Sequence, residues 1–299
     1  MLAQLQKRIT FGLLAMALGW LIYFWQRAPV WAVAGFFTIA LGYTALLALE
    51  LSFLRFANRA DPAPKATAAE LISAWLGESW AVARVFFWHQ PFRSQTMPNH
   101  LAAEHITQGK RGVVFVHGFV CNRGFWNPWL ERLQGTGHAY VAVNLEPLFG
   151  SIDDYTPSID AAVQEVTQAT GLAPLVVCHS MGGLAVRAWL QTMQAQARVH
   201  HVVTIGTPHR GTWLARLAYG KNAMQMRLAS DWQAALNRAT PEGQHALFTC
   251  WYSTADNIVF PASTATLPGA DNRLIRGKGH VQMAFDPELI NANLADLHG

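Results

Sequence analysis

Charged residues are scarce in this chain of 299 residues. Asp, Glu, Lys and Arg make up 13% of it, whereas hydrophobic residues make up 52%. Average soluble chains carry roughly 25% charged residues, so part of this chain is expected in lipid or in a large core. The net charge of +4 is small and its basic residues are dispersed, so no nucleic-acid partner is expected.

Cysteine is also rare, with three residues at Cys121, Cys178 and Cys250. An odd number without metal-ligand spacing argues against a disulfide framework and fits a reducing compartment. The sequence lacks the His/Cys spacing of a zinc site, a glycine-rich phosphate loop and a dinucleotide fingerprint. We therefore expect no metal ion and no cofactor.

Long apolar runs, in contrast, are concentrated at the N-terminus. Residues 9–25 and 30–49 contain no charge and are separated only by Gln26-Arg27-Ala28-Pro29. Each run is close to the ~20 residues that a helix needs to cross a bilayer. We predict a two-helix transmembrane anchor over residues 1–60, with residues 9–54 meeting the bilayer. A cleaved signal peptide is one alternative, although no small-x-small site follows the first run; a buried globular helix pair is another.

The basic residues around these runs predict an orientation. Only Arg27 lies in the turn, and the others flank the hairpin: Lys7, Arg8, Arg55, Arg59 and Lys65. Basic residues favour the cytoplasmic side. We expect a multi-pass protein of the inner cell membrane with its remaining residues in the cytoplasm.

A linker and helical connector is predicted at residues 61–109. The segment 61–65 contains two prolines, and Thr67 with Glu70 has the pattern of a capping box that opens a helix. The apolar stripe that follows has two interpretations: a helix packed on a core, or an amphipathic helix that docks on lipid.

From residue 110 onwards, short apolar runs alternate with helical patterns. Runs that are apolar on both faces are typical of a buried parallel sheet, and the alternation predicts a doubly wound, mostly parallel α/β domain over residues 110–299. The expected strands are 113–116, 140–143, 175–177, 202–205, 247–252 and 273–276. The expected helices are 127–133, 158–170 and 183–194.

Ser180 is placed as a catalytic nucleophile would be. It follows the strand 175–177 and precedes the helix that begins near Gly183. A sharp strand-to-helix turn lifts the serine oxygen above the sheet and directs the first backbone N–H groups of the helix at the reacting oxygen. Gly182 and Gly183 supply the small side chains that such a crowded turn requires.

Three segments carry a resemblance to a known superfamily. Cys178-His179-Ser180-Met181-Gly182-Gly183, the segment 116–119 and Gly206-Thr207-Pro208-His209 resemble segments of the α/β-hydrolase superfamily, in particular its bacterial lipase and esterase group and inositol-deacylase relatives. Cys178 stands where the usual elbow has its first glycine. The resemblance covers residues 110–293 and implies the α/β-hydrolase fold. It also implies an oxyanion hole made by the backbone N–H groups of Phe119 and Met181, with His117 holding the loop.

The resemblance further implies an acid and a base after Ser180 in the chain. Asp256 follows the strand 247–252 and His280 follows the last strand, so we expect Ser180, Asp256 and His280 to form a catalytic triad. Asp271 is the alternative acid, although it precedes its strand. His209 is the alternative base, with a structural role preferred.

These residues predict a membrane-anchored serine ester hydrolase that forms an acyl-serine intermediate. An apolar cap at about 212–240 is either a lid or a pair of core helices, and with the hairpin it favours lipid esters as substrates. A membrane-tethered acyltransferase or thioesterase with the same triad is one alternative, and a catalytically silent scaffold is another. The oligomeric state stays open.

Overall fold

The centre of the molecule is a six-stranded, all-parallel sheet in a computed structural model that describes residues 1–101 and 107–298. Its strand order is β2-β1-β3-β4-β5-β6. The strands are β1 Val113–Val116, β2 Tyr140–Ala142, β3 Leu175–His179, β4 His201–Ile205, β5 Phe248–Ser253 and β6 Asp271–Ile275. The predicted α/β-hydrolase architecture is confirmed, with every strand within a few residues of its expected place.

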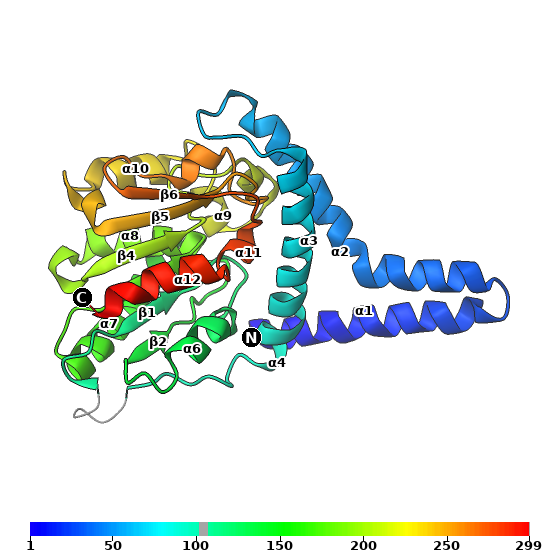
Figure 1. The fold of residues 1–299 in the computed structure, drawn as a ribbon, viewed down its shortest axis with the longest axis horizontal. Helices are drawn as coiled ribbons and strands as arrows, with labels where there is room; N and C mark the ends of the chain where they lie inside the picture. The colour runs from blue at the N-terminus through cyan, green and yellow to red at the C-terminus, as the bar shows by residue number, and fades with distance from the viewer. Residues whose placement is uncertain (102–106, 299) are drawn as a thin grey trace.

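Helices cover both faces of the sheet (Figure 1). Successive strand residues point to opposite faces, so Val114 and Val176 pack with one set of helices, while Val113 and Val177 pack with the other. The helices of the α/β domain are α6 Asn127–Leu133, α7 Thr156–Thr170, α8 Met181–Thr192, α9 Lys221–Gln225, α10 Asp231–Ala239, α11 His280–Met283 and α12 Pro287–Leu294. Short 3-10 helices lie at Asn58–Ala60, Arg123–Trp126, Ile152–Tyr155, Gln196–Arg198, Trp213–Leu217, Gln244–Leu247, Ala262–Ala265 and Ala295–His298.

The strand order reverses between β1 and β3, which lie side by side although β2 comes between them in sequence. Val116 at the end of β1 is paired in register with Cys178 in β3. Open parallel sheets bind ligands beyond the carboxyl ends of their strands at such a reversal. The segments that begin at His117 and Ser180 both leave the sheet at this point.

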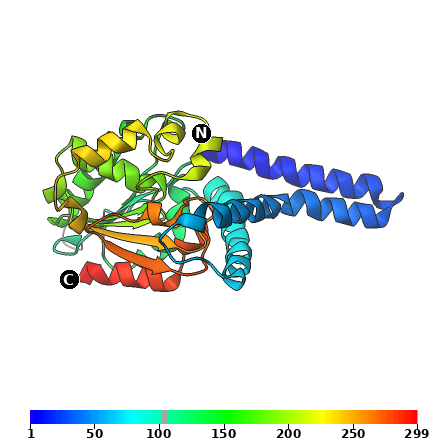
Figure 2. The ribbon, with the colours of Figure 1, turned by 90° about the horizontal axis from the view of Figure 1, so that it is seen from above.

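Two long helices form the N-terminal hairpin, α1 Leu2–Trp25 and α2 Pro29–Ala57. α1 and the first part of α2 project together from the α/β domain, and the later part of α2 bends back along it (Figure 1, Figure 2). Both helices are long and apolar enough to cross a membrane by length and composition. Their side chains are largely exposed, which does not fit the alternative of a buried globular helix pair.

The connector contains α3 Ala68–Arg84, a π-helical turn Val85–His89 and α4 Gln90–Phe92. The predicted capping box is present, because the Thr67 side chain accepts from Glu70 N and the Glu70 carboxylate accepts from Thr67 N at 2.8 Å. α3 lies against the α/β domain and buries Ala74, Glu78 and Ala81. Residues 102–106 of the predicted connector lie outside the described residues.

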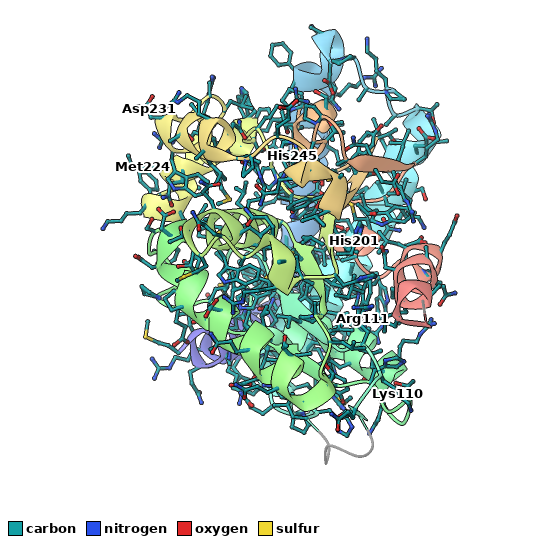
Figure 3. The ribbon with its side chains drawn as sticks, turned by 90° about the vertical axis from the view of Figure 1, so that its left-hand side faces the viewer. Lys110, Arg111, His201, Met224, Asp231 and His245 are labelled. Carbon is teal, nitrogen blue, oxygen red and sulfur yellow. The ribbon has the colours of Figure 1, made fainter. Side chains whose placement is uncertain are left out.

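The segment predicted as a cap runs along one side of the molecule, where Met224 and Asp231 lie near each other (Figure 3). Its apolar residues are divided: Met226 and Leu236 are buried, whereas Tyr219 and Met224 are exposed. Asn222 fixes the segment to the body, since its side-chain amide donates to Leu148 O at 2.9 Å and to Tyr155 Oη at 3.1 Å. The apolar stripe is therefore shared between the core and the surface.

Candidate active site

Ser180 occupies a strained turn between β3 and α8. Its backbone angles are φ 55° and ψ −128°, a conformation that costs non-glycine residues of order 1–3 kcal/mol and is concentrated at functional sites. The turn is fixed from both sides, because Ser180 N donates to Ile205 O at 2.9 Å and the Thr207 hydroxyl donates to Ser180 O at 2.9 Å. The surrounding structure thus holds this serine where the sheet meets the helix.

The neighbours of Ser180 explain the sequence of the turn. A Cβ atom on Gly182 would lie 2.4 Å from Val116 O and 2.6 Å from His117 O, so only glycine fits. The Cys178 side chain, in contrast, is fully buried in the core beneath α7 and α8. The position that holds the first glycine in the usual elbow therefore accommodates the small side chain of Cys178 in this protein.

Asp256 and His280 form a buried pair after β5 and β6. His280 Nδ1 lies 3.0 Å from Asp256 Oδ2, and the other carboxylate oxygen accepts from Ile258 N at 2.9 Å and Val259 N at 2.8 Å. With Asp256 accepting, Nδ1 carries the proton and Nε2 of the neutral ring is free to act as a base. The carboxylate therefore fixes both the position and the tautomer of the imidazole.

The charge around His280 favours its protonated form. Burial alone would lower the pKa of His280, but the carboxylates of Asp256, Glu78 and Glu50 together outweigh it, so the pKa is raised. Asp256 contributes most to this increase, through both its charge and its hydrogen bond. A base with a raised pKa takes a proton from a hydroxyl group more readily.

The pair packs directly beside the serine turn. A Cβ atom on Gly206, the residue after Ile205, would lie 3.0 Å from both Asp256 Oδ2 and His280 Nδ1. The ring of His179 lies 4.5 Å from the ring of His280 between centroids, and its Nε2–H donates to His280 O at 3.1 Å. The structure thus brings the predicted residues Ser180, Asp256 and His280 to one edge of the sheet.

The loop after β1 borders the same site. A Cβ atom on Gly118 would lie 2.8 Å from Ser180 Cβ, so the backbone of Gly118 lies next to the serine. Phe119 is the next residue in the chain. Within the described residues 1–101 and 107–298, no hydrogen bond engages the backbone N–H of Phe119. Met181 begins α8, so its N–H has no partner inside that helix. Both groups are positioned near the serine as potential donors.

His117 holds this loop in place. It accepts from Leu145 N at Nε2, at 3.1 Å, and its Nδ1–H donates to Gly118 O at 2.9 Å. Burial lowers the pKa of His117 to about 4, so the ring is neutral and keeps this pattern at physiological pH. The expected structural role of His117 agrees with these contacts.

The two alternative triad members lie elsewhere. The His209 ring contacts Thr204 Oγ1 at 3.1 Å and Cys250 Sγ at 3.6 Å, in the core on the α8 side of the sheet. Asp271 begins β6, pairs in register with Thr249 and forms an ion pair with Arg273 at 2.7 Å. It lies at the amino end of the parallel strands, opposite to the edge that holds Ser180.

Two further carboxylates, from the N-terminal helices, hold the segment that carries His280. Glu78 in α3 accepts from Val281 N at 2.9 Å and from Gln282 N at 2.8 Å. Glu50 in α2 accepts from the Asn257 side chain at 2.6 Å, and Asn257 in turn accepts from His280 N at 3.0 Å. The sequence reasoning missed both. The sequence does contain a signal for them, since each is an acidic residue within an apolar helix. Buried carboxylates are rare unless they are paired, so each implies a partner elsewhere in the fold.

An apolar cavity of about 460 Å³ lies beside the loop after β1. It is bordered by the start of α1, by Cys121 and by the loop after β2. Its apolar lining comprises Met1, Leu2, Leu5, Leu145, Pro147, Leu148 and Phe149, and its polar lining comprises Asn122, Asn144 and Glu146. The ring centroids of Phe149 and Phe119 are 5.8 Å apart. The Cys121 thiol lies against the backbone of Gly118, which in turn borders Ser180.

Comparison with known proteins assigns this geometry to a family. The family model for palmitoyl protein thioesterases matches residues 112–266, which span Ser180 and Asp256 and make up just over half of the chain. A lipase of Bacillus licheniformis in its mature form matches with a TM-score of 0.57 at 19% identity, over 66% of this chain and 95% of that one. Aspergillus fumigatus lipase B matches with a TM-score of 0.56 at 19% identity, over 85% of this chain and 66% of that one.

At these identities the two lipases support the fold alone. The family model, with the serine turn and the hydrolase sheet, identifies a lipase-, esterase- or thioesterase-like hydrolase. The chain belongs to the palmitoyl protein thioesterase family and has the α/β-hydrolase fold.

Proposed function

We propose that this protein is a membrane-anchored serine hydrolase that cleaves long-chain acyl esters through an acyl-serine intermediate. Ser180 is the nucleophile, His280 the general base and Asp256 the carboxylate that orients the base. The observation that carries the proposal is the strained, buried Ser180 turn beside the buried Asp256–His280 pair. Positioned nucleophile, base and orienting carboxylate are the requirements for this chemistry.

The reaction has two halves. His280 Nε2 takes the Ser180 proton as the serine oxygen attacks the ester carbonyl, and the protonated ring then donates that proton to the leaving alcohol. In the second half, His280 deprotonates a water molecule that attacks the acyl-serine, and Ser180 recovers its proton. The N–H groups of Phe119 and Met181 hold the oxyanion in both halves, where one such donor contributes roughly 2.7–4 kcal/mol.

The substrate class is proposed from the apolar cavity beside this site. Leu5, Leu148 and Phe149 line it, and the Phe119 and Cys121 contacts connect its wall to the loop that borders Ser180. Each methylene buried there would contribute about 0.8 kcal/mol. A long acyl chain from a glycerolipid or lysolipid is the ligand that fits this lining, and it makes the start of α1 part of the substrate site.

A thioester is the second candidate, because the family model is that of palmitoyl protein thioesterases. The same triad cleaves an acyl thioester, with a thiol as the leaving group instead of an alcohol. Assays of esters and thioesters with the same acyl chain, on the same preparation, distinguish the two by their kcat/KM values. An acyltransferase would instead give labelled acyl products with added alcohol or thiol acceptors.

We propose residues 1–60 as the anchor, 61–109 as the connector and 110–299 as the catalytic domain with its cap at 212–240. The exposed apolar surface of α1 and α2 supports a bilayer-spanning hairpin. The basic residues at both ends of the hairpin favour a catalytic domain in the cytoplasm, on the inner face of the cell membrane. A reporter fused after Gly299 that is active only outside the cell would contradict that orientation.

The direct test labels detergent-purified protein with a fluorophosphonate probe, followed by an ester chain-length series. We expect labelling at Ser180, its loss in Ser180→Ala, a fall in kcat on the order of ~10⁶-fold in that variant, and higher kcat/KM for long than for acetyl esters. Folded protein that does not react with the probe would identify a scaffold. A preference for acetyl or butyryl esters would contradict the long-chain substrate class.

A further inference from the structure

The outer face of α3 carries a row of large, exposed apolar side chains. Ile72, Leu76 and Trp80 are 60%, 59% and 72% exposed, and their spacing of four residues places them on one side of the helix. Trp88, in the π-helical turn that continues α3, is 52% exposed. A contiguous apolar surface of this kind marks a site of interaction.

The backbone positions of this row lie on the side of α3 away from the catalytic domain, although the Trp80 side chain also borders a cavity lined by Gln282 and Phe285. Glu78, which contacts the segment after His280, is two positions from both Leu76 and Trp80, and a two-residue step turns an α-helix by about 200°. Figure 1 shows α3 running across the base of the hairpin, transverse to α1, and Figure 2 shows the hairpin leaving from the side of the molecule where α3 lies. If the hairpin spans a bilayer, α3 lies parallel to the membrane plane.

Aromatic rings connect the outer face of α3 to the first hairpin helix. The ring centroids of Trp88 and Phe92 are 5.8 Å apart, and those of Phe92 and Phe11 are 5.6 Å apart. The Lys7 ammonium lies 5.6 Å from the centroid of the Phe92 ring. Aromatic rings beside a basic residue are typical of the boundary between acyl chains and headgroups.

We propose that the outer face of α3 docks onto the lipid bilayer, with Ile72, Leu76 and Trp80 inserted among the acyl chains at the interface. This proposal rests on the membrane-spanning hairpin of the proposed function. An amphipathic interfacial helix inserts its apolar side about 5–10 Å into the boundary. The active-site edge of the sheet would then be held at the lipid surface.

Site-specific quenching in proteoliposomes tests the docking. The three native cysteines are buried, so single introduced cysteines can be labelled selectively with an environment-sensitive dye. We compare Leu76→Cys with Gln164→Cys, an exposed position in α7, and with Leu18→Cys in the hairpin. Spin-labelled phospholipid should quench the dye at position 76 at least threefold more than at position 164.

Quenching at the three positions distinguishes the docking of α3 from the membrane-spanning hairpin on which it rests. Quenching at 18 but equal quenching at 76 and 164 would overturn the docking of α3 and leave the hairpin in the membrane. Equal, weak quenching at all three would overturn the spanning hairpin itself, and the docking with it.

A different observation concerns the inner face of the same helix. Glu78 is only 2% exposed, and its two carboxylate oxygens accept from Val281 N at 2.9 and 3.0 Å and from Gln282 N at 2.8 Å. It also packs against Gly279, where an added Cβ atom would lie 2.4 Å from Glu78 Oε2. One buried carboxylate thus binds the two residues that follow His280 and packs against the residue that precedes it.

We infer that Glu78 is a positioning residue for His280. By accepting from the two backbone N–H groups that follow the base, its carboxylate limits where the imidazole can lie. Its negative charge adds to those of Asp256 and Glu50 around the ring, and the neutral ring of His179 packs against the same imidazole. Because burial raises the pKa of Glu78 to about 7, the charge it contributes itself depends on pH near neutrality.

The test compares Glu78→Gln and Glu78→Asp in the full chain, with Glu131→Gln on the exposed face of α6 as a matched control. Rates are divided by the number of sites that react with the fluorophosphonate probe, so misfolded protein is not counted. We expect Glu78→Gln to lower kcat by up to about 100-fold with little change in KM, because the base is displaced. Its acidic limb of kcat/KM should move to lower pH, because the base loses a neighbouring negative charge.

Glu78→Asp keeps the charge on a shorter side chain, so its acidic limb should stay near that of the wild type while kcat falls. A Glu78→Gln protein with lower thermal stability but wild-type kcat and pH profile per reactive site would show a purely structural role and overturn the inference. If Glu78→Gln yields no reactive sites, an unchanged kcat in Glu78→Asp would overturn it instead.

Discussion

Gly182→Ala should strongly lower the activity of the enzyme without removing any group that takes part in the chemistry. The added methyl group would lie 2.4 Å from Val116 O and 2.6 Å from His117 O, and ordinary contact begins at 3.4 Å. Both neighbours are backbone atoms, so neither can rotate away. The start of α8 and the end of β1 must therefore separate by about 1 Å, at the turn that carries Ser180.

The size of the effect follows from that displacement. Misplacement of a catalytic group by 1 Å costs on the order of 10²-fold in rate, and overpacking of this kind costs about 1–3 kcal/mol in stability. We expect kcat/KM for a long-chain ester to fall about 100-fold and the rate of fluorophosphonate labelling of Ser180 to fall in parallel.

The control is Gly42→Ala in α2, where an added Cβ atom meets nothing within 4 Å. Alanine there improves helix propensity by up to about 1 kcal/mol, and activity should be unchanged. A Gly182→Ala enzyme with kcat/KM within threefold of the wild type would refute the steric reasoning and the place of this turn in the active site.

Three further predictions follow from the site. Asp256→Asn should lower kcat by roughly 10⁴-fold, as loss of the orienting carboxylate does in serine proteases, and steady-state kinetics would detect it; a loss below tenfold would remove Asp256 from the triad. Burial raises the pKa of Glu78 from 4.5 to about 7 in the folded protein, so its protonation adds to the free energy of unfolding in full below pH 4.5, and this contribution is lost as the pH rises to about 7. Thermal unfolding should show the loss in the wild type but not in Glu78→Gln. Leu148→Trp should fill the cavity and lower kcat/KM for long-chain esters at least tenfold more than for butyryl esters, whereas equal losses would place the acyl chain elsewhere.

The parts of this fold that were predictable from sequence are those with a strong local signal. Runs such as 113–116 are apolar at every position because both faces of the sheet are covered, and this pattern located the strands. Ser180, Asp256 and His280 each follow a strand, and the carboxyl ends of parallel strands meet at one edge, so their proximity was expected. Their catalytic roles stay proposals until they are tested.

The missed features depend on contacts between distant segments. In the sequence, Glu50 and Glu78 are isolated acidic residues in apolar helices. Their hydrogen-bond partners lie about 200 residues away along the chain. The interpretation of the connector as a helix packed on a core agrees with the burial of Glu78 and Ala81, whereas its docking on lipid stays a prediction that the exposed Leu76 and Trp80 allow. A helical pattern reveals that two faces exist, but only the tertiary structure shows what each one contacts.

The contact between Glu78 and the backbone of Val281 also has a consequence for biosynthesis. Its partners are separated by 203 residues, so the helices of the N-terminal region leave the ribosome long before the segment that carries His280. Domains form from the N-terminal side during synthesis, and the hairpin can enter the bilayer while Ser180 still lacks its base. The nascent chain is therefore expected to carry no hydrolytic activity against the lipid around it until translation is nearly complete.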